Sequence, residues 1–538
     1  MSRTGTVPEL LALGALDAGV RLAAGYPGAP VTGVMETLAR LTGEEVVVEW
    51  ATNERSAFDA AFGASLAGVP SLVCLKGVGL NVALDSLMAA NLAGGPGGFV
   101  VLVGDDPGAW GSQNEQDSRL LAAAAEVPLL EATGAASCAA AMAHAFDLSR
   151  RHAVPVLVRL TSSLALESGP PPAANRPEVR VRVDFRREPG RYTVLPATVV
   201  AYHRRLHRTL AAIGREFERS SLNRRRGEGE AGVVAAGNAA AKLERYLRAA
   251  GGPPLQVLTL GTLLPLPEET LAGFLAAVAR ALVVEETLPY LEERLLALSR
   301  RRGLTLPVLG RLTGHIPSAG EITEGDIGRA LAALLPGHLW PAVEAPTRHL
   351  PSQESLCPDC PYVPAFLELL AAFEARGGRE AFVVTGEPGC MVRALLPPFE
   401  LLDVKYAMGS SIGLAAGLAR AQREKKVVSL AGDSALLHTG LQELIDAAQA
   451  DAPLMVMVLD NATVALTGGQ PHAASGRDLR GQPRRPVDLE RLVRACGVER
   501  VWVADPRRRG AFRVALAQSL DAEGLRVVIA RAPCPRGG

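Results

Sequence analysis

Two polar turns, each directly after an apolar, strand-like run, have the residue types and the spacing of a site for a metal-bound diphosphate. The first turn contains Gly432-Asp433-Ser434, and the second contains Asn461, 28 residues after Asp433. A helix-like stretch between the two runs makes residues 427–470 a β-α-β crossover. Both turns then lie at the carboxyl edge of one parallel sheet, which is where open α/β sheets bind ligands.

The chemistry of a magnesium ion fits these residue types. Mg2+ takes oxygen ligands and is usually held by one or two protein carboxylates together with substrate phosphates. The Asp433 carboxylate, the Asn461 carboxamide and the main-chain carbonyl of Thr463 would supply such a set. Gly432 would let phosphate oxygens approach the main chain, and Ser434 would donate a hydrogen bond. A glycine-acid turn is also common in doubly wound sheets, so the spacing to Asn461 is what favours a metal site.

Two further segments could contribute to the same ligand. Gly409-Ser410-Ser411 precedes a helix rich in small residues, and its main chain could approach a flat ring closely. Packing between helices explains this glycine equally well. Glu54 begins a helix that is nearly free of charge, so we expect the helix to be buried and Glu54 to lie at its buried end. An acid in a first helical turn can also simply complement the helix dipole, which is worth up to about 1 kcal/mol.

Four of the seven cysteines lie in turns. Cys357 and Cys360 form a C-x-x-C pair in a proline-stiffened loop, Cys390 follows Gly-Glu-Pro-Gly, and Cys534 lies in Ala-Pro-Cys-Pro. Thiolates in such turns can converge on an iron-sulfur cluster or on zinc. The absence of histidine from the neighbouring sequence favours thiolate-only ligation, and incidental cysteines are the alternative. The cysteines in apolar stretches, which are expected in the core, are Cys74, Cys138 and Cys496.

The order of strand-like and helix-like segments predicts an α/β protein with parallel sheets flanked by helices. The chain has 538 residues, enough for three or four domains of about 150 residues each. Proline-rich breaks and a basic stretch divide it into three α/β units joined by two connectors. The predicted segments are residues 1–168, 169–230, 231–336, 337–356 and 357–538, of which the second and fourth are the connectors.

Composition excludes several classes of function. Lys and Arg total 56 and Asp and Glu total 56, so the formal net charge is zero, which argues against bulk electrostatic binding to nucleic acid or to an anionic membrane. The basic stretch 203–226 is expected to be a solvated helix followed by a linker rather than a nucleic-acid site. Because no apolar run approaches the ~18 residues of a spanning helix and no signal peptide is recognisable, we expect a soluble, cytoplasmic protein.

Beyond these single motifs, nearly the whole chain resembles the thiamine diphosphate-dependent 2-oxoacid:ferredoxin oxidoreductases, most closely the alpha subunits of the indolepyruvate branch. Ordered matches along a chain are far more specific than any one motif. The matching segments are AGYPGAP (24–30), NERSAFDAAFGASLAG (53–68), KGVGLNVALDSLM (76–88), GDDPGAWGSQNEQDSR (104–119), VVEETLPYLEERL (283–295), GEIT (320–323), CPDCP, PGC, MGSSIG, GDSALLHTG, LDNATVALTGGQPH (459–472) and RAPCPR.

The resemblance implies an aminopyrimidine-binding domain first, a transketolase C-terminal-like domain second and a diphosphate-binding domain third. It implies that Glu54 contacts the pyrimidine nitrogen N1′ of thiamine diphosphate. It further implies that Asp433, Asn461 and the carbonyl of Thr463 bind Mg2+. The four turn cysteines match positions that hold a 4Fe-4S cluster in related oxidoreductases. Other cofactor contacts are expected from Gly409, Ser410, Ser411, Gly432, Ser434 and His438.

The activity that the resemblance implies is oxidative decarboxylation of an aryl- or branched-chain, indolepyruvate-like 2-oxoacid. Coenzyme A would take the acyl group, and an external ferredoxin would take the electrons. A small beta- or gamma-type subunit is the expected partner. A homodimer or higher oligomer of this chain is the expected assembly.

Departures from the family pattern leave two alternatives open. Indolepyruvate subunits usually carry a C-terminal ferredoxin-like domain, and we expect a chain without it because the sequence ends shortly after Cys534. Substitutions such as Gly77, where the family favours histidine, fall in segments expected near the substrate. One alternative is a non-oxidative thiamine-dependent decarboxylase or carboligase. The other is a non-catalytic scaffold, against which the retention of Glu54, Asp433 and Asn461 argues.

Overall fold

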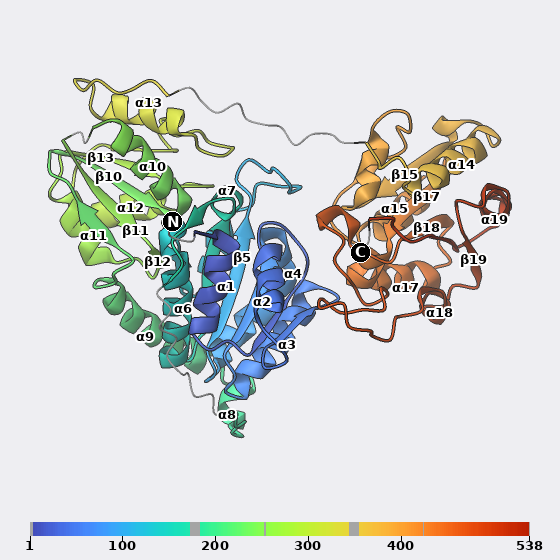
Figure 1. The fold of residues 1–538 in the computed structure, drawn as a ribbon, viewed down its shortest axis with the longest axis horizontal. Helices are drawn as coiled ribbons and strands as arrows, with labels where there is room; N and C mark the ends of the chain where they lie inside the picture. The colour runs from blue at the N-terminus through green and yellow to red at the C-terminus, as the bar shows by residue number, and fades with distance from the viewer. Residues whose placement is uncertain (1–3, 173–182, 252–253, 344–354, 423, 537–538) are drawn as a thin grey trace. The chain divides into compact units, whose positions relative to one another are not determined.

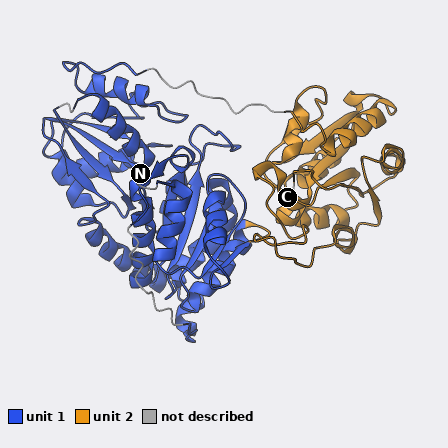
Figure 2. Cartoon of the chain, viewed as in Figure 1, with its two compact units in different colours: residues 1–49, 54–350 blue, residues 50–53, 351–538 orange. Residues whose placement is uncertain are grey.

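The computed structural model describes residues 4–172, 183–251, 254–343, 355–422 and 424–536. The chain divides into two compact units: unit 1 is residues 1–49 with 54–350, and unit 2 is residues 50–53 with 351–538 (Figures 1 and 2). Largely parallel sheets with flanking helices fill both units, which confirms the predicted fold class. Parts of both predicted connectors, residues 173–182 and 344–354, lie outside the described residues. The division into three domains stays a prediction.

The first sheet of unit 1 has seven strands in the order β12-β6-β7-β5-β4-β2-β3. Every residue of β5 and β7 is buried, because helices cover both faces of a parallel sheet of this kind. The strands are β2 (Leu22–Gly25), β3 (Val47–Trp50), β4 (Ser71–Lys76), β5 (Phe99–Asp105), β6 (Leu129–Glu131), β7 (Val156–Thr161) and β12 (Thr262–Leu264). The helices are α1 (Val7–Asp17), α2 (Thr32–Leu41), α3 (Glu54–Leu66), α4 (Gly77–Ala93), α5 (Ser118–Ala124), α6 (Cys138–His152) and α7 (Ser162–Ala165).

The second sheet of unit 1 has five strands in the order β14-β13-β10-β11-β9. Its strands are β9 (Arg224–Arg226), β10 (Ala231–Ala236), β11 (Leu255–Leu260), β13 (Arg280–Val284) and β14 (Val308–Leu309). Its helices are α10 (Gly237–Ala249), α11 (Glu268–Leu275), α12 (Tyr290–Arg301) and α13 (Glu324–Leu334). The helices α8 (Pro189–Tyr192) and α9 (Val199–Phe217) instead contact α4 beside the first sheet, where Arg191 and Arg205 donate to the carbonyls of Ala93 and Leu92. A two-stranded antiparallel pair, β1 (Gly5–Thr6) with β8 (Ser168–Gly169), completes the unit.

The basic stretch 203–226 differs in part from its prediction. Its helical half is α9, which buries Tyr202, Leu206 and Ile213 on one face and is exposed on the other. Its second half was expected to be a linker but contains β9, an antiparallel edge strand on β11. The reason is tertiary: Arg225 donates to Gln256 Oε1 at 2.6 Å and lies over the Phe274 ring.

A buried network of ion pairs joins the two sheets of unit 1. The fully buried Arg119 guanidinium on α5 donates to Asp117 Oδ2 at 2.6 Å and to Glu285 Oε2 at 2.7 Å. Glu285 directly follows β13 of the second sheet and accepts the main-chain N–H of Leu291 at 2.8 Å. Burial raises the pKa of Asp117, but the charges of Arg119 and Arg159 outweigh burial and hold that pKa well below its ordinary range.

Arg159 on β7 extends this network. Its Nε donates to Asp105 Oδ2 at 2.5 Å, and its Nη1 donates to Glu131 Oε1 at 2.8 Å. The same Nη1 donates to the main-chain oxygen of Glu286 at 3.0 Å, so a second contact reaches the far sheet. Two guanidiniums therefore pair with four buried carboxyl groups at the junction of the two sheets, and burial raises the pKa of two of these, Glu131 and Glu285.

Unit 2 contains one six-stranded parallel sheet in the order β16-β15-β17-β18-β20-β19. Its strands are β15 (Phe382–Gly386), β16 (Val404–Lys405), β17 (Lys426–Gly432), β18 (Leu454–Asp460), β19 (Arg500–Ala504) and β20 (Arg526–Arg531). Its helices are α14 (Tyr362–Glu374), α15 (Ser411–Ala421), α16 (Asp433–Ala435), α17 (Leu441–Gln449), α18 (Leu489–Ala495) and α19 (Arg509–Asp521). Short 3-10 or π-helical segments of unit 2 lie at Arg379–Ala381, Cys390–Leu395, Leu436–Gly440 and Ala465–Thr467, and unit 1 has one at Ala135–Ser137.

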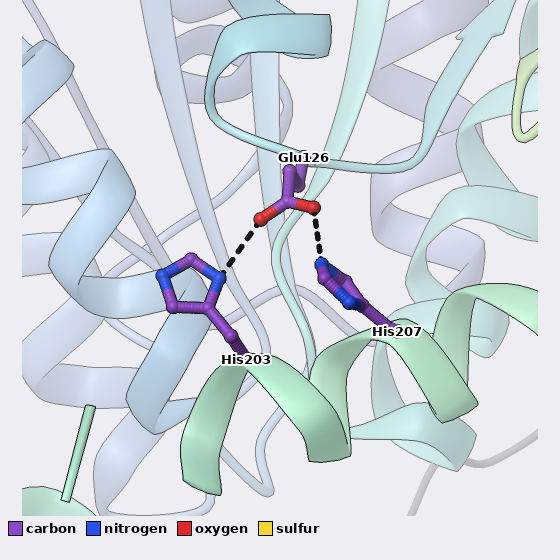
Figure 3. A group of neighbouring side chains, drawn as sticks. All are labelled: Glu126, His203 and His207. Atoms are coloured by element: carbon purple, nitrogen blue, oxygen red, sulfur yellow. Dashed lines mark hydrogen bonds and ion pairs between the residues drawn. The ribbon is translucent and has the colours of Figure 1, made fainter. Parts of the chain in front are cut away.

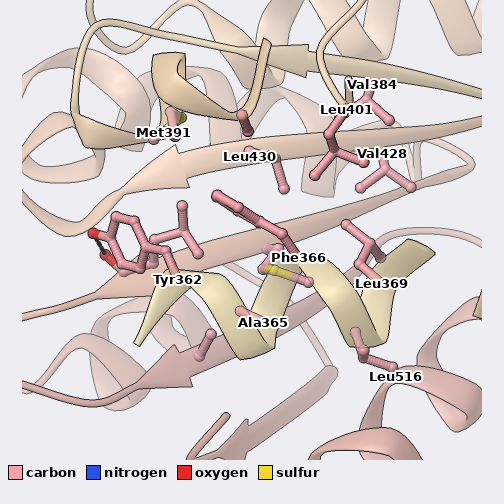
Figure 4. Packing of buried hydrophobic residues seen from close by; sticks show 14 of the residues in the cluster. Tyr362, Ala365, Phe366, Leu369, Val384, Met391, Leu401, Val428, Leu430 and Leu516 are labelled. Atoms are coloured by element: carbon pink, nitrogen blue, oxygen red, sulfur yellow. Dashed lines mark hydrogen bonds between the residues drawn. The ribbon is translucent and has the colours of Figure 1, made fainter. Parts of the chain in front are cut away.

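Helices cover both faces of this sheet, so its central strands β17 and β18 are largely apolar and buried. Phe366 and Leu369 of α14 point onto Val428 and Leu430 of β17 (Figure 4). The opposite face packs against α15 and α17 through residues such as Ile412. In the part of the chain that the structure describes, no helix has both the length and the apolar character needed to cross a membrane.

Replacing Arg119 by methionine tests the network that joins the sheets of unit 1. Methionine fills much of the same space but removes the cation closest to the buried Asp117 and Glu285. We expect the free energy of unfolding in urea to fall by about 3–5 kcal/mol. The control is Arg301→Met, which removes an ion pair to Glu268 from a side chain that is 60% exposed, and should cost less than about 1 kcal/mol. Equal losses in the two variants would contradict a structural role for the network.

Candidate cofactor site

The two polar turns predicted to hold a diphosphate meet in unit 2. β17 and β18 pair in parallel with Gly432 opposite Leu459, so the residues that follow the two strands emerge side by side. Asp433 Oδ2 accepts the main-chain N–H groups of Asn461 at 3.1 Å and Ala462 at 2.8 Å. The structure therefore brings Asp433 and Asn461 together across 28 residues of sequence.

The oxygens of these turns suit a divalent cation. Asp433 Oδ1 accepts one hydrogen bond, from Ser434 N at 2.7 Å, and Asn461 Oδ1 accepts one, from Thr463 N at 3.1 Å. Each oxygen thus keeps a lone pair for a metal. A Cβ added to Gly432 would make ordinary van der Waals contact with Met391 Cε at 3.7 Å and Ala435 Cβ at 3.9 Å. The donor set fits Mg2+ with a diphosphate.

His472 belongs to this site and was not predicted as one of its residues. Its ring is 5% exposed, and its Nε2 lies 3.2 Å from Asp433 Oδ2. The residue is part of the matched segment 459–472, but nothing in its spacing to Asp433 indicated a contact. It adds a hydrogen-bond partner that fixes the Asp433 carboxylate.

The predicted glycine-serine segment lies beside the same strand ends. Gly409 has a φ of 79°, and a Cβ there would lie 2.0 Å from Thr439 Oγ1. This contact requires a glycine for packing against the π-helical turn Leu436–Gly440 whether or not a ring also approaches. Ser411 begins α15, and Ser410 Oγ donates to the Ala407 carbonyl at 2.7 Å. The buried His438 lies in the same turn, with its Nδ1 3.3 Å from Thr439 Oγ1.

Glu387 is the main residue that the sequence did not reveal. Its fully buried carboxylate accepts the N–H of Gly409 at 2.7 Å on Oε2 and the N–H of Gly432 at 2.8 Å on Oε1. The Ser411 hydroxyl donates to Oε2 at 3.4 Å. Burial raises the pKa of Glu387 to about 8, and the N–H groups of Gly432 and Gly409 oppose that rise. One carboxylate thus holds three segments of the candidate site in place.

Glu54 lies in unit 1, at the first position of α3, and is 7% exposed. A Cβ on Gly79 would lie 2.5 Å from Glu54 Oε1, so Gly79 leaves the room that this carboxylate occupies. The expectation that the whole of α3 is buried is wrong. Asp59 and Gly63 are exposed, because the helix covers the sheet with only one face.

The four turn cysteines line one cavity of unit 2, about 320 Å3 in volume. Asn461 lies in the same wall, and Cys534 N donates to the Asn461 carbonyl at 3.0 Å. Cys360 N donates to the Cys357 carbonyl at 3.0 Å, which closes the C-x-x-C turn. Of the cysteines predicted for the core, two are buried, whereas Cys496 is only partly buried because it lies at the end of α18.

The spacing of these thiols is wider than a single ion requires. Tetrahedral zinc with Zn–S bonds of about 2.3 Å places its sulfurs about 3.8 Å apart. Among the described residues, the cysteines form no group of three whose ligand atoms all lie within 4.8 Å of one another. Burial raises the pKa of Cys390 to about 11 against the opposing charge of Arg393, so ligation would have to displace the thiol proton.

Comparison with known proteins gives two family matches. The model of the thiamine pyrophosphate enzyme C-terminal TPP binding domain matches residues 388–530. The model of the thiamine diphosphate-binding region of pyruvate flavodoxin/ferredoxin oxidoreductases matches residues 13–205. The two matches include the segments that carry Asp433 and Glu54, respectively.

Curated relatives extend these matches to nearly the whole chain. Indolepyruvate oxidoreductase subunit IorA of Methanothermobacter marburgensis is 34% identical over 97% of this chain and 85% of its own length. The IorA subunit of Archaeoglobus fulgidus is 33% identical over 98% of this chain and 85% of its own length. Ketoisovalerate oxidoreductase subunit VorA of Methanothermobacter thermautotrophicus is 31% identical over 30% of this chain and 38% of its own length. A solved 2-oxoglutarate:ferredoxin oxidoreductase from Magnetococcus marinus aligns with a TM-score of 0.46 and 17% identity over 57% of this chain and 61% of that chain.

Replacing Glu387 by glutamine tests its role in positioning the site. Glutamine has the same size, but its NH2 group must face one of the donors that the carboxylate now accepts. We expect a loss of about 1–3 kcal/mol in the free energy of unfolding and weaker binding of thiamine diphosphate, measured by calorimetry. The control is Glu443→Gln, because Glu443 accepts only one main-chain N–H, from Gly413 at 2.7 Å, and is less buried.

The pH dependence of the stability of the same variant shows whether Glu387 ionises in the folded chain or contributes only by its packing. The pKa of Glu387 is about 8 in the folded chain against an ordinary value of 4.5, so the native state holds its proton longer than the unfolded state. Its contribution to stability is therefore complete below about pH 4.5 and falls as the pH rises towards about 8. The stability advantage of the unsubstituted chain over Glu387→Gln should shrink across this window. An advantage independent of pH would contradict the raised pKa.

Proposed function

The chain belongs to the family of indolepyruvate oxidoreductase IorA subunits, and we propose that it is the thiamine diphosphate-dependent subunit that oxidatively decarboxylates an aryl- or branched-chain 2-oxoacid. Coenzyme A receives the acyl group, and ferredoxin receives the electrons. The observation that supports this most directly is the cavity lined by four cysteines and by Asn461. Named relatives act on indolepyruvate and ketoisovalerate, an aryl and a branched-chain 2-oxoacid, so both substrate classes belong to the proposal.

The cofactor-binding roles follow from the strand ends of unit 2. Asp433, Asn461 and the Thr463 carbonyl would hold Mg2+, and His472 keeps the Asp433 carboxylate in place. Ser434 would donate to a phosphate oxygen. When bound, thiamine diphosphate supplies a carbon nucleophile for the 2-oxo group and an electron sink for the loss of carbon dioxide.

Glu54 has the proton-transfer role in this proposal. Its carboxyl group would hold or move a proton at the pyrimidine nitrogen N1′, which is the step that activates the cofactor. Burial suits the task, because a carboxyl group removed from water interacts more strongly with the atom it faces. Gly79 supports the role by leaving the space that the Glu54 side chain fills.

The four turn cysteines have the electron-transfer role. Cys357, Cys360, Cys390 and Cys534 would ligate a 4Fe-4S cluster, which suits thiolate-only donors on separate turns. We further propose that a small beta- or gamma-type subunit completes the enzyme and that this chain forms a homodimer or higher oligomer in the cytoplasm.

Anaerobic purification tests the cluster. We expect a broad absorbance near ~400 nm together with bound iron and sulfide, typical of cysteine-ligated iron-sulfur. Cys390→Ser should lose this absorbance, whereas the control Cys496→Ser should keep it, because Cys496 does not line the cavity. A colourless protein that still releases carbon dioxide from a 2-oxoacid would replace the proposal with the non-oxidative decarboxylase.

Replacing Glu54 by glutamine tests the proton-transfer role. The assay measures the rate at which a low-potential viologen is reduced with each of a panel of aryl and branched 2-oxoacids as substrate. We expect this rate to fall by about 100- to 10,000-fold. Thiamine diphosphate should remain bound, because the diphosphate site is unchanged. Glu49→Gln is the control, since it makes the same chemical change at an exposed position. An active Glu54→Gln enzyme would rule out the assigned role.

A further inference from the structure

Three side chains that the proposed function does not use lie together in unit 1: Glu126, His203 and His207 (Figure 3). Glu126 Oε2 is 3.0 Å from His203 Nδ1, and Glu126 Oε1 is 2.6 Å from His207 Nε2. The three ligand atoms all lie within 4.8 Å of one another. The side chains are 32%, 44% and 59% exposed, respectively, so ions in solution can reach them.

The backbone of α9 and the backbone of the turn that carries Glu126 fix this arrangement. His203 and His207 are four residues apart on α9, so they lie one turn apart on the same face of the helix. Glu126 follows α5 with a φ of 54°, in the left-handed region that glutamate rarely adopts. The Asn91 side chain donates to the Glu126 carbonyl at 2.9 Å and so holds this turn in place. The Glu126 carboxylate is thereby directed at the two imidazoles (Figure 3).

We propose that Glu126, His203 and His207 form a binding site for a zinc-like transition-metal ion, with a remaining coordination position for water. Two imidazole nitrogens and one carboxylate oxygen are a ligand set that zinc uses with an open fourth position. Imidazole donors disfavour Mg2+ and Ca2+, which take oxygen ligands. Around tetrahedral zinc with bonds of about 2.0–2.1 Å, ligand atoms stand about 3.4 Å apart. The His203–Glu126 and His207–Glu126 contacts, at 3.0 and 2.6 Å, are shorter than that spacing by about 0.4 and about 0.8 Å.

A second contact between a histidine and a glutamate, His152 of α6 with Glu216 of α9, lacks the third ligand that such a site requires. His152 Nε2 lies 2.6 Å from Glu216 Oε1, the same distance as in the His207 contact. The other oxygen of Glu216 accepts from Arg151 Nη1 at 2.7 Å. A guanidinium has no lone pair to give and stays charged, so that group offers at most two ligands beside a positive charge. Of these two groups, only the Glu126 group offers three metal ligands.

The metal would cross-link two segments that are far apart in the sequence. Glu126 is 77 residues from His203 and 81 residues from His207. Closing a loop of this length costs the unfolded chain more entropy than closing a short one, so a metal at this position favours the folded unit. Binding to the folded state alone also raises stability by mass action. The neighbouring Arg204 and Arg208 are exposed, so water and salt screen their charges.

Zinc binding by the metal-stripped full chain tests the site. We expect the unsubstituted chain to bind one more equivalent of Zn2+ in equilibrium dialysis than His203→Ala/His207→Ala, and to gain a few degrees in Tm that the double variant does not gain. Co2+ identifies the donors, because nitrogen and oxygen ligands give d–d absorption without the thiolate charge-transfer band that the cysteine cavity would add. His152→Ala is the matched control and should keep the full stoichiometry.

Equal zinc stoichiometry and equal Tm shifts in the unsubstituted chain and the double variant would overturn the proposal and leave a simple ion-pair cluster. Glu126→Gln should lower the affinity while preserving the helix, because glutamine keeps the size but loses the charge. If circular dichroism shows that the double variant is misfolded, the single substitution His207→Gln decides the question. His207 is the most exposed of the three side chains, so this change leaves the packing of α9 intact.

Discussion

The parallel register between β17 and β18 is the constraint on which the candidate diphosphate site depends. Gly432 lies opposite Leu459, so the chain leaves both strands at the same level. Asp433 can then accept N–H groups from Asn461 and Ala462 without any distortion of the sheet. A slip of one residue would turn every side chain of a strand to the other face. The two packed faces of the sheet forbid that slip, so packing far from the site fixes its geometry.

The sequence alone predicts which residues lie together where their positions depend only on strand order and strand ends. Asp433 and Asn461 could be placed together because a β-α-β crossover puts successive strand ends at one edge. That inference needs only the periodicity of apolar residues and the position of turns. The four turn cysteines, which line one cavity although Cys357 and Cys534 are 177 residues apart, were expected to act together from the family resemblance, because Cys357 and Cys360 precede α14 and follow no strand of this sheet.

The residues that the sequence did not reveal depend on tertiary contacts. Glu387 is a single acid after a strand, and only the folded chain shows that Gly409 and Gly432 converge on it. Arg119 lies in a segment that carries the family resemblance, yet its role is visible only once Glu285 of the second sheet lies beside it. Apart from Asp117, which is two residues before Arg119, the partners of both residues lie tens to hundreds of residues away, so local spacing does not reveal their roles.

Buried charge has different consequences in the two units. Asp117 lies beside Arg119 and Arg159, which keep its carboxylate charged despite burial. Glu387 instead accepts from two N–H groups and one hydroxyl, and repulsion from Glu443 adds to the cost of its charge. Dipoles compensate a buried charge less completely than a guanidinium does, which is why the pKa of Glu387 is about 8. Asp117 in unit 1 therefore stays charged near neutral pH, whereas Glu387 beside the candidate cofactor site can gain or lose its proton there.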